Sequence, residues 1–124
     1  MATSLILEGN QISNDVVVAS AAQTASGNSG ILGGYGSALS LRVQLAVTAA
    51  SGTVPTLDMV VEDTVDGTNF FTIATFTQAT GVTAAVQSVA PTASFTDRIR
   101  LRWTIAGTTP SFTFAVQIFA KGRR

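Results

Sequence analysis

The only cluster of acidic side chains in this chain of 124 residues is the segment Glu62–Gly67, with the sequence EDTVDG. Grouped carboxylates can bind calcium, and a pair of them can catalyse glycoside hydrolysis. The spacing does not match an EF-hand loop, however. The segment ends in Asp66-Gly67 between two alternating segments, which is a strong hairpin signal. We therefore expect a turn here, with calcium binding and a glycosidase-type carboxylate pair as the alternatives.

Other catalytic groups are scarce. The chain has no His and no Cys, which excludes thiolate nucleophiles, imidazole bases, ordinary zinc sites and Ser-His-Asp triads. The glycine-rich segment Gly30–Gly36 lacks the lysine and the following helix that a phosphate-binding loop requires. We expect no catalytic residue, no cofactor and no metal site, and hence a protein that is not an enzyme.

Arginines recur at every second position of the segment Asp97–Ile105. The residues on this side are Arg98, Arg100, Arg102 and Thr104, and those on the other side are Ile99, Leu101, Trp103 and Ile105. A slip of one residue would place three guanidinium groups in the core, so the register of this strand is strongly fixed. The arginines could pair across strands with Asp58 and Glu62. Alternatively, they form a basic stripe that docks on an acidic protein surface.

Charge is sorted along the chain. Residues 1–97 hold all seven acidic side chains and one basic side chain, Arg42, whereas residues 98–124 hold six basic side chains and no acidic one. The formal charges are therefore −6 and +6. Such asymmetry can mark an interaction region. A nucleic acid partner is not expected, because a duplex-binding protein normally shows a basic face without compensating acids.

The composition is unusually poor in charge. Charged residues make up 11% of the chain, against about 25% in ordinary soluble domains, while Thr and Ala number 18 each. A surface of small, weakly polar side chains is easily desolvated, so we expect a subunit largely covered by its neighbours. A very stable monomeric β-domain is the alternative. No apolar run approaches a membrane span, and the N-terminus lacks the basic region of a signal peptide.

Alternation with a period of two residues recurs along the chain, and turn residues separate the alternating segments. The expected strands are Thr3–Glu8, Asp15–Ala21, Leu39–Thr48, Thr56–Thr64, Asn69–Thr77, Val82–Val89, Asp97–Ile105 and Ser111–Ala120. This pattern predicts an all-β fold, a single antiparallel β-sandwich or jelly-roll-like domain of about eight strands over residues 1–124. Its predicted core contains Leu57, Met59, Ile73, Ile99, Leu101, Trp103, Phe112 and Phe114.

One motif occurs twice. Gly52-Thr53-Val54-Pro55-Thr56 and Gly107-Thr108-Thr109-Pro110-Ser111 both read G-T-x-P-[S/T], and each follows an alternating segment that contains arginine. Glycine supplies unusual backbone angles, and proline stops a ladder of hydrogen bonds. The repeat predicts two hairpins built on one template, at equivalent corners of a sandwich. Chance similarity between two Thr-rich hairpins is the alternative.

The segment Ala21–Gly36 (AAQTASGNSGILGGYG) has five glycines and no alternation. A loop of this length is usually functional or disordered. We expect residues 1–36 to form an N-terminal arm and a glycine-rich loop, with Ile31, Leu32 and Tyr35 as apolar anchors on a neighbouring subunit. A mobile connector is the alternative.

Several segments resemble small virion structural proteins of tailed bacteriophages, and together they cover about residues 16–119. They are Ser20–Gly30, Leu41–Asp58, Glu62–Phe70, Asp97–Ile105 and Gly107–Phe114. The resemblance implies a non-catalytic β-sandwich, and the chain length suggests a capsid decoration (cement) protein on the outer head surface. A tail, neck or tail-terminator component is the alternative, and a virion-displayed receptor- or glycan-binding module is the alternative from another class.

The same resemblance sets the expected partners and location. The partners would be the major capsid protein or other virion subunits, with no nucleic acid and no membrane. The chain would form a homo-oligomer, a trimer being the first expectation, and would be made in the host cytoplasm before it joins the virion. The interface candidates are Ile31, Leu32, Tyr35, Arg98, Arg100 and Arg102.

Overall fold

Antiparallel strands make up nearly all of the structure, a computed structural model that describes residues 12–80, 85–91 and 94–122. The elements are β1 (Ile12–Gln23), β2 (Gly27–Asn28), the short 3-10 helix η1 (Tyr35–Ser37), β3 (Ala38–Thr64), β4 (Phe70–Thr75), β5 (Ala79–Thr80), β6 (Ala85–Val89) and β7 (Arg98–Gly122). The predicted all-β, antiparallel class is confirmed. The expected strand Thr3–Glu8 and the first residues of Val82–Val89 lie outside the described residues.

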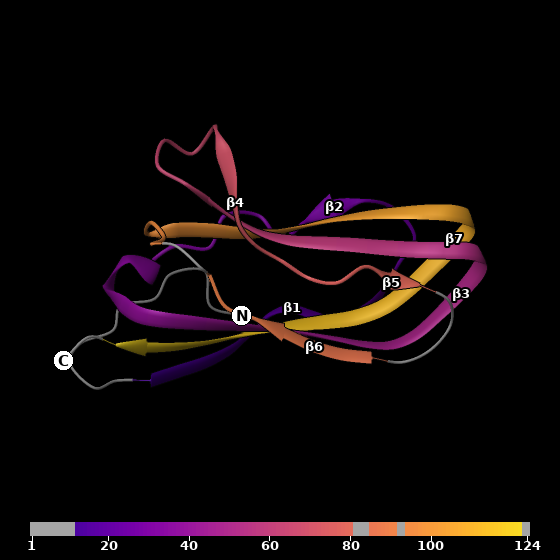
Figure 1. Cartoon of the computed structure of the whole chain (residues 1–124), viewed down its shortest axis with the longest axis horizontal. Coiled ribbons are helices and arrows are strands. Elements are labelled where there is room, and N and C mark those ends of the chain that lie inside the picture. The colour runs from indigo at the N-terminus through magenta and orange to yellow at the C-terminus, as the bar shows by residue number, and fades with distance from the viewer. Residues whose placement is uncertain (1–11, 81–84, 92–93, 123–124) are drawn as a thin grey trace.

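The seven strands form one sheet that folds back on itself into two layers (Figure 1). The central order is β1-β7-β3-β4, with β2 paired to β7, and with β5 and β6 paired to β3. The lower layer in Figure 1 contains β1, β6, residues 38–51 of β3 and residues 111–122 of β7. The upper layer contains β2, β4, residues 56–64 of β3 and residues 98–106 of β7.

β3 and β7 run through both layers as one continuous antiparallel pair, from Ala38 opposite Gly122 to Thr64 opposite Arg98. The expectation of two separate hairpins at the G-T-x-P motifs, at equivalent corners, is therefore wrong: the two motifs lie opposite each other at one shared corner. Both strands bend where Thr53 faces Thr108, and the register shifts on either side of that pair. The prolines fall in these irregular positions, where a ladder hydrogen bond is not required. They consequently mark a bend and do not end the strand.

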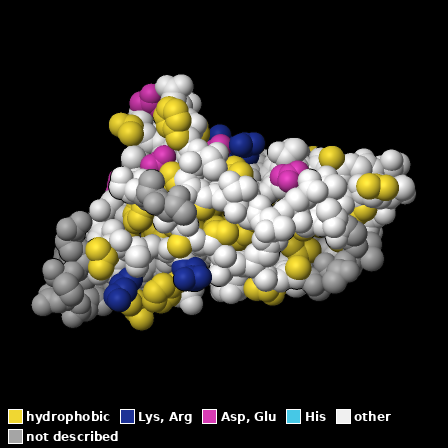
Figure 2. Space-filling view, in the orientation of Figure 1, with side chains coloured by type: hydrophobic (Ala, Val, Ile, Leu, Met, Phe, Trp, Pro, Cys, Tyr) yellow, Lys and Arg dark blue, Asp and Glu magenta, His cyan; other side chains and the backbone are white. Residues whose placement is uncertain are grey.

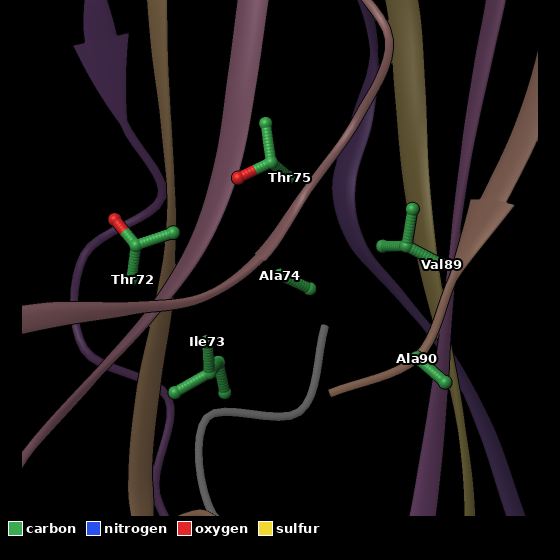
Figure 3. Close-up of a pocket in the computed structure, with 6 residues that line it drawn as sticks. All are labelled: Thr72, Ile73, Ala74, Thr75, Val89 and Ala90. Atoms are coloured by element: carbon green, nitrogen blue, oxygen red, sulfur yellow. The ribbon is translucent and has the colours of Figure 1, made fainter. Parts of the chain in front are cut away.

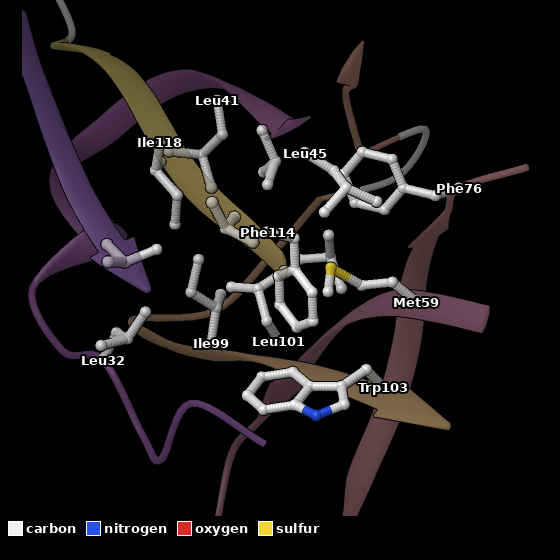
Figure 4. Packing of buried hydrophobic residues seen from close by; sticks show 14 of the residues in the cluster. Leu32, Leu41, Leu45, Met59, Phe76, Ile99, Leu101, Trp103, Phe114 and Ile118 are labelled. Carbon is white, nitrogen blue, oxygen red and sulfur yellow. The ribbon is translucent and has the colours of Figure 1, made fainter. Parts of the chain in front are cut away.

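The core lies between the two layers (Figure 4). Alternation places Ile99 and Leu101 from the upper layer opposite Phe114 from the lower layer, all with no exposed surface. The Trp103 ring meets the Phe114 ring edge to face, with centroids 5.3 Å apart. The predicted core is confirmed apart from Ile73, which is only partly buried against the cluster. Alternation thus predicted the inward rows of three segments, 57–61, 97–105 and 111–120.

Candidate interaction surfaces

Glu62 joins two of the three alternating arginines on the outer face of the upper layer. Its Oε1 accepts a bond from Arg100 Nε at 2.8 Å, and its Oε2 accepts one from Arg102 Nε at 2.9 Å. The Arg100 guanidinium also lies 3.5 Å from the centroid of the Phe70 ring. Burial by itself would raise the pKa of Glu62, but the hydrogen bonds and charges of the two arginines outweigh it and lower the pKa. Cross-strand pairing, one of the two expectations for these arginines, is therefore present.

The other residues expected in this cross-strand pairing, Asp58 and Arg98, have different partners. Asp58 accepts two bonds from Gln78 Nε2, at 3.1 and 3.0 Å, and does not join the arginine row. Arg98 Nη2 donates to the backbone carbonyl of Val65. Arg98 and Arg100 thus hold parts of their own chain in place, whereas the Arg102 side chain keeps 43% of its surface exposed. Of the two arginines paired with Glu62, Arg102 is the more accessible, since the Arg100 side chain keeps 21% of its surface exposed.

The acidic segment forms the predicted turn between β3 and β4. Asp66 Oδ1 accepts bonds from the backbone N–H groups of Thr68 and Asn69, both at 2.8 Å. These bonds stabilise the ionised carboxylate and lower the pKa of Asp66 well below its usual range. Gly67 adopts φ 82°, which suits glycine in this kind of turn. Within the described residues, no three side chains capable of binding a metal ion are grouped together.

The glycine-rich segment packs on its own chain. Leu32 exchanges two backbone hydrogen bonds with Ile99, at 2.8 and 3.0 Å, and the Tyr35 N–H donates to the Asp97 carbonyl at 3.0 Å. Leu32 and Tyr35 are each only 1% exposed. The expectation that they anchor on a neighbouring subunit is wrong in this structure, because they fill the chain's own core. Ile31 is the exception, with 40% of its surface exposed.

Residues 12–36 accordingly do not extend from the domain as an arm. β1 pairs along β7 from Ile12 opposite Lys121 to Gln23 opposite Phe112. Further along, Ser29 N–H donates to the Leu101 carbonyl at 2.9 Å. The glycines let the backbone follow the end of the sandwich closely, and this allows a segment without alternation to contribute apolar side chains to the core.

A surface that the sequence did not reveal covers the outer face of the lower layer. Opposite partners across a sheet share a face, and this face carries large apolar side chains together with two basic ones. We define the basic apolar face as Ile12, Val16, Arg42, Val86, Phe119 and Lys121. All six residues are exposed. Figure 2 shows basic side chains beside hydrophobic ones along the lower side of the molecule.

The exposure of Phe119 was not predicted from the sequence, because this residue lies within a segment whose other phenylalanines are buried. It stands one position out of phase with the buried side chains Phe114, Val116 and Ile118, so it faces away from them, between Asn14 and Arg42 on the neighbouring strands. Its odd position in the alternation, against the even positions of the inward row, was the sequence signal that it points outward. Whether an outward phenylalanine is covered by another element depends on the tertiary structure, and this one is 39% exposed.

A hollow of about 450 Å³ opens between β4 in the upper layer and the end of β6 in the lower layer (Figure 3). It is lined by Thr72, Ile73, Ala74, Thr75, Val89 and Ala90. These side chains carry no charge and no strong nucleophile, so the lining offers shape and weak hydrogen bonding only.

Within the described residues there is no helix long and apolar enough to cross a membrane.

No protein-family model matches the chain, and no curated protein sequence is significantly similar to it. Solved structures do share its fold. A chain of infectious bursal disease virus, Gx strain, superposes with a TM-score of 0.52 at 13% identity, over 94% of this chain and 38% of that chain. Dimeric latent PorU from Porphyromonas gingivalis superposes with a TM-score of 0.50 at 9% identity, over 98% of this chain and 14% of that chain.

A third similar structure is endo-1,4-beta-D-xylanase 10B from Clostridium thermocellum, solved as its CBM22-1-GH10 modules with xylohexaose. It superposes with a TM-score of 0.50 at 16% identity, over 100% of this chain and 30% of that chain. In all three cases the chain spans well under half of the similar protein. At such low identity the likeness shows a shared all-β fold and nothing more specific.

Proposed function

We propose that the chain is a structural protein of a virion that attaches by protein–protein contacts, as a capsid decoration protein of a tailed bacteriophage does. One observation carries the proposal. Four of the nine exposed large apolar side chains that the structure describes, Ile12, Val16, Val86 and Phe119, lie on the outer face of one layer. Large apolar side chains gathered on one exposed face usually mark a surface that another molecule covers.

Two further features support an attachment role. The chain is poor in charge, with 11% charged residues and a formal net charge of zero, which favours association over free solution. In addition, a viral structure, that of infectious bursal disease virus, contains a chain with this fold. Attachment would act by mass action, since a protein that binds the assembled shell and not its parts stabilises the shell. At 100 times the dissociation constant the gain is about 2.7 kcal/mol per site.

The test uses empty shells assembled from the capsid protein encoded by the same genome. We expect the purified chain to co-sediment with these shells and to raise their temperature of disruption. Sedimentation velocity on the free protein would reveal a closed homo-oligomer, with a trimer as the expected state. A chain that neither binds shells nor changes their disruption temperature would overturn the proposal. Binding to purified tails or necks in place of shells would assign it to those structures.

Glycan binding is a second candidate, and the β3–β4 hairpin is the observation that favours it. Phe71 projects from this hairpin with 64% of its surface exposed, and exposed aromatic rings can stack on sugars. One similar structure was solved with xylohexaose. Isothermal titration of the chain with xylohexaose tests this function, with Phe71→Ala as the variant. Heat of binding that the variant lacks would support it, and no heat at millimolar sugar would exclude this ligand.

A further inference from the structure

The basic apolar face combines two kinds of side chain in a definite arrangement. Phe119 lies on β7, an inner strand of the lower layer, directly opposite Arg42 on β3, and Lys121 lies two residues further along β7. The Arg42 guanidinium is held along the sheet by a 3.1 Å bond from its Nη1 to Ser88 Oγ on β6. The arrangement thus places a half-exposed aromatic ring beside two cations on one rigid sheet.

The charge on this face is of one sign. In the described part of the chain, neither Arg42 nor Lys121 forms an ion pair, and no acidic residue shares a register position with the outward side chains of the lower layer. Asp15 of β1 is opposite the buried Ile118 and therefore faces inward. A covering surface must neutralise two cations, because like charges brought together across an interface cost free energy.

This requirement argues against a second copy packed face to face. A two-fold interface places the same patch on both sides, so it would bring a face with two cations and no carboxylate against an identical face. The four apolar side chains argue against a nucleic acid, since such interfaces are strongly basic and polar. A protein surface with carboxylates beside apolar side chains satisfies both requirements.

We infer that the basic apolar face is the docking face of this protein, and that its partner is a protein surface carrying carboxylates around an apolar patch. The inference rests on the proposed function, in which that surface belongs to the outside of the viral shell. Phe119 and Val86 would be desolvated against the apolar patch, and the carboxylates would pair with Arg42 and Lys121. The apolar contacts would set the dissociation rate, and the charges would mainly set the association rate.

The experiment compares three double variants in co-sedimentation with empty shells, as above. Val86→Ser/Phe119→Ser removes apolar surface from the face, and Arg42→Glu/Lys121→Glu reverses its charge. Val65→Ser/Phe71→Ser is the matched control, because those side chains are 74% and 64% exposed on the β3–β4 hairpin of the upper layer. Circular dichroism and thermal melting verify that each variant is folded.

We expect the control to bind shells as the wild type does. Both face variants should bind at least tenfold more weakly, and the loss for the charge-reversed variant should shrink as salt is raised from about 50 to about 300 mM, because ions screen exposed charges. Loss of binding in the control alone would overturn the docking face and leave the proposed function intact. If the wild type does not bind shells at all, the proposed function fails, and the inference fails with it.

Two other molecules could cover the basic apolar face, a second copy of the chain or a nucleic acid. Each would give a distinct experimental result, and either result would overturn the inference. A second copy would appear as self-association of the wild type in sedimentation velocity that Val86→Ser/Phe119→Ser abolishes. A nucleic acid would appear as binding of a 20-base-pair DNA duplex that Arg42→Glu/Lys121→Glu abolishes, with displacement of the chain from shells by the duplex.

Discussion

At the bend of the β3–β7 pair, Gly52 on β3 packs against the backbone of β7, and Gly107 on β7 packs against the backbone of β3. The atoms that each glycine approaches are equivalent. A Cβ on Gly52 would lie 2.8 Å from the Thr109 carbonyl oxygen and 2.9 Å from Pro110 Cα; a Cβ on Gly107 would lie 2.8 Å from the Val54 carbonyl oxygen and 2.9 Å from Pro55 Cα. The two copies of the G-T-x-P motif therefore form one corner, in which each glycine has the same contacts with the other copy. The bend requires both glycines.

The first prediction concerns this corner. Gly52→Ala or Gly107→Ala should each lower the free energy of unfolding by about 1–3 kcal/mol from backbone strain alone, because φ is 115° and 123° at these positions. The double variant should lose less than the sum, since either change already opens the shared corner. Urea denaturation measures all three variants.

Gly30→Ala is the control for this prediction. Gly30 has φ 77°, but a Cβ there would meet no atom within 4 Å, so only the left-handed backbone cost of about 1 kcal/mol applies. Equal losses at Gly30 and Gly52 would show that the close approach at the corner contributes nothing.

The second prediction compares two neighbours in the glycine-rich segment. Leu32→Ala should cost about 2–5 kcal/mol, the usual range for a fully buried leucine, because Leu32 is 1% exposed. Ile31→Ala should cost well under that, since Ile31 is 40% exposed. Thermal and urea denaturation give both values. If Leu32→Ala leaves stability unchanged, the segment is a detachable arm after all.

The third prediction concerns Glu62. Its pKa is lowered from the usual 4.5, so the carboxylate stabilises the fold above about pH 4.5 and the contribution is lost as the pH falls through the lower, folded-state pKa. Glu62→Gln should reduce stability at pH 7 by about 1–3 kcal/mol, because Arg100 and Arg102 lose a charged acceptor. Arg102 should contribute less of this loss in stability than Arg100, because solvent screens the charge of a half-exposed side chain.

Denaturation as a function of pH tests the sign of the effect. The gap between the wild type and Glu62→Gln should narrow as the pH drops from 5 toward 3. Asp58→Asn serves as the control, because Asp58 is exposed and bonded only to Gln78 among the described residues. A gap that stays constant with pH would mean that the ionised state of Glu62 does not matter.

The fourth prediction uses Tyr35, the single tyrosine of the chain. Burial first, and the nearby negative charge of Asp15 second, raise the pKa of Tyr35 to about 12. An unfolded chain ionises its tyrosine near pH 10, so stability should fall as the pH rises above about 10. Ultraviolet absorbance of tyrosinate follows the titration. A midpoint near 10 in the folded protein would place Tyr35 at the surface.

The sequence by itself determined the features that depend on local periodicity. A period of two residues assigned the inward face of Asp97–Ile105 and the outward row of arginines, and Asp66-Gly67 predicted the β3–β4 turn. These predictions succeeded because alternation and turn chemistry act within a few residues of the chain.

Only the tertiary structure decided which surfaces are covered. The G-T-x-P motifs read as stops in sequence but became one bend, because each glycine is pressed against the other strand. Leu32 and Tyr35 lie in a segment without periodicity and are buried by strands distant in sequence. Phe119 faces outward without a cover in the described part of the chain. Burial depends on which elements pack over a face, and that information is spread over the whole chain.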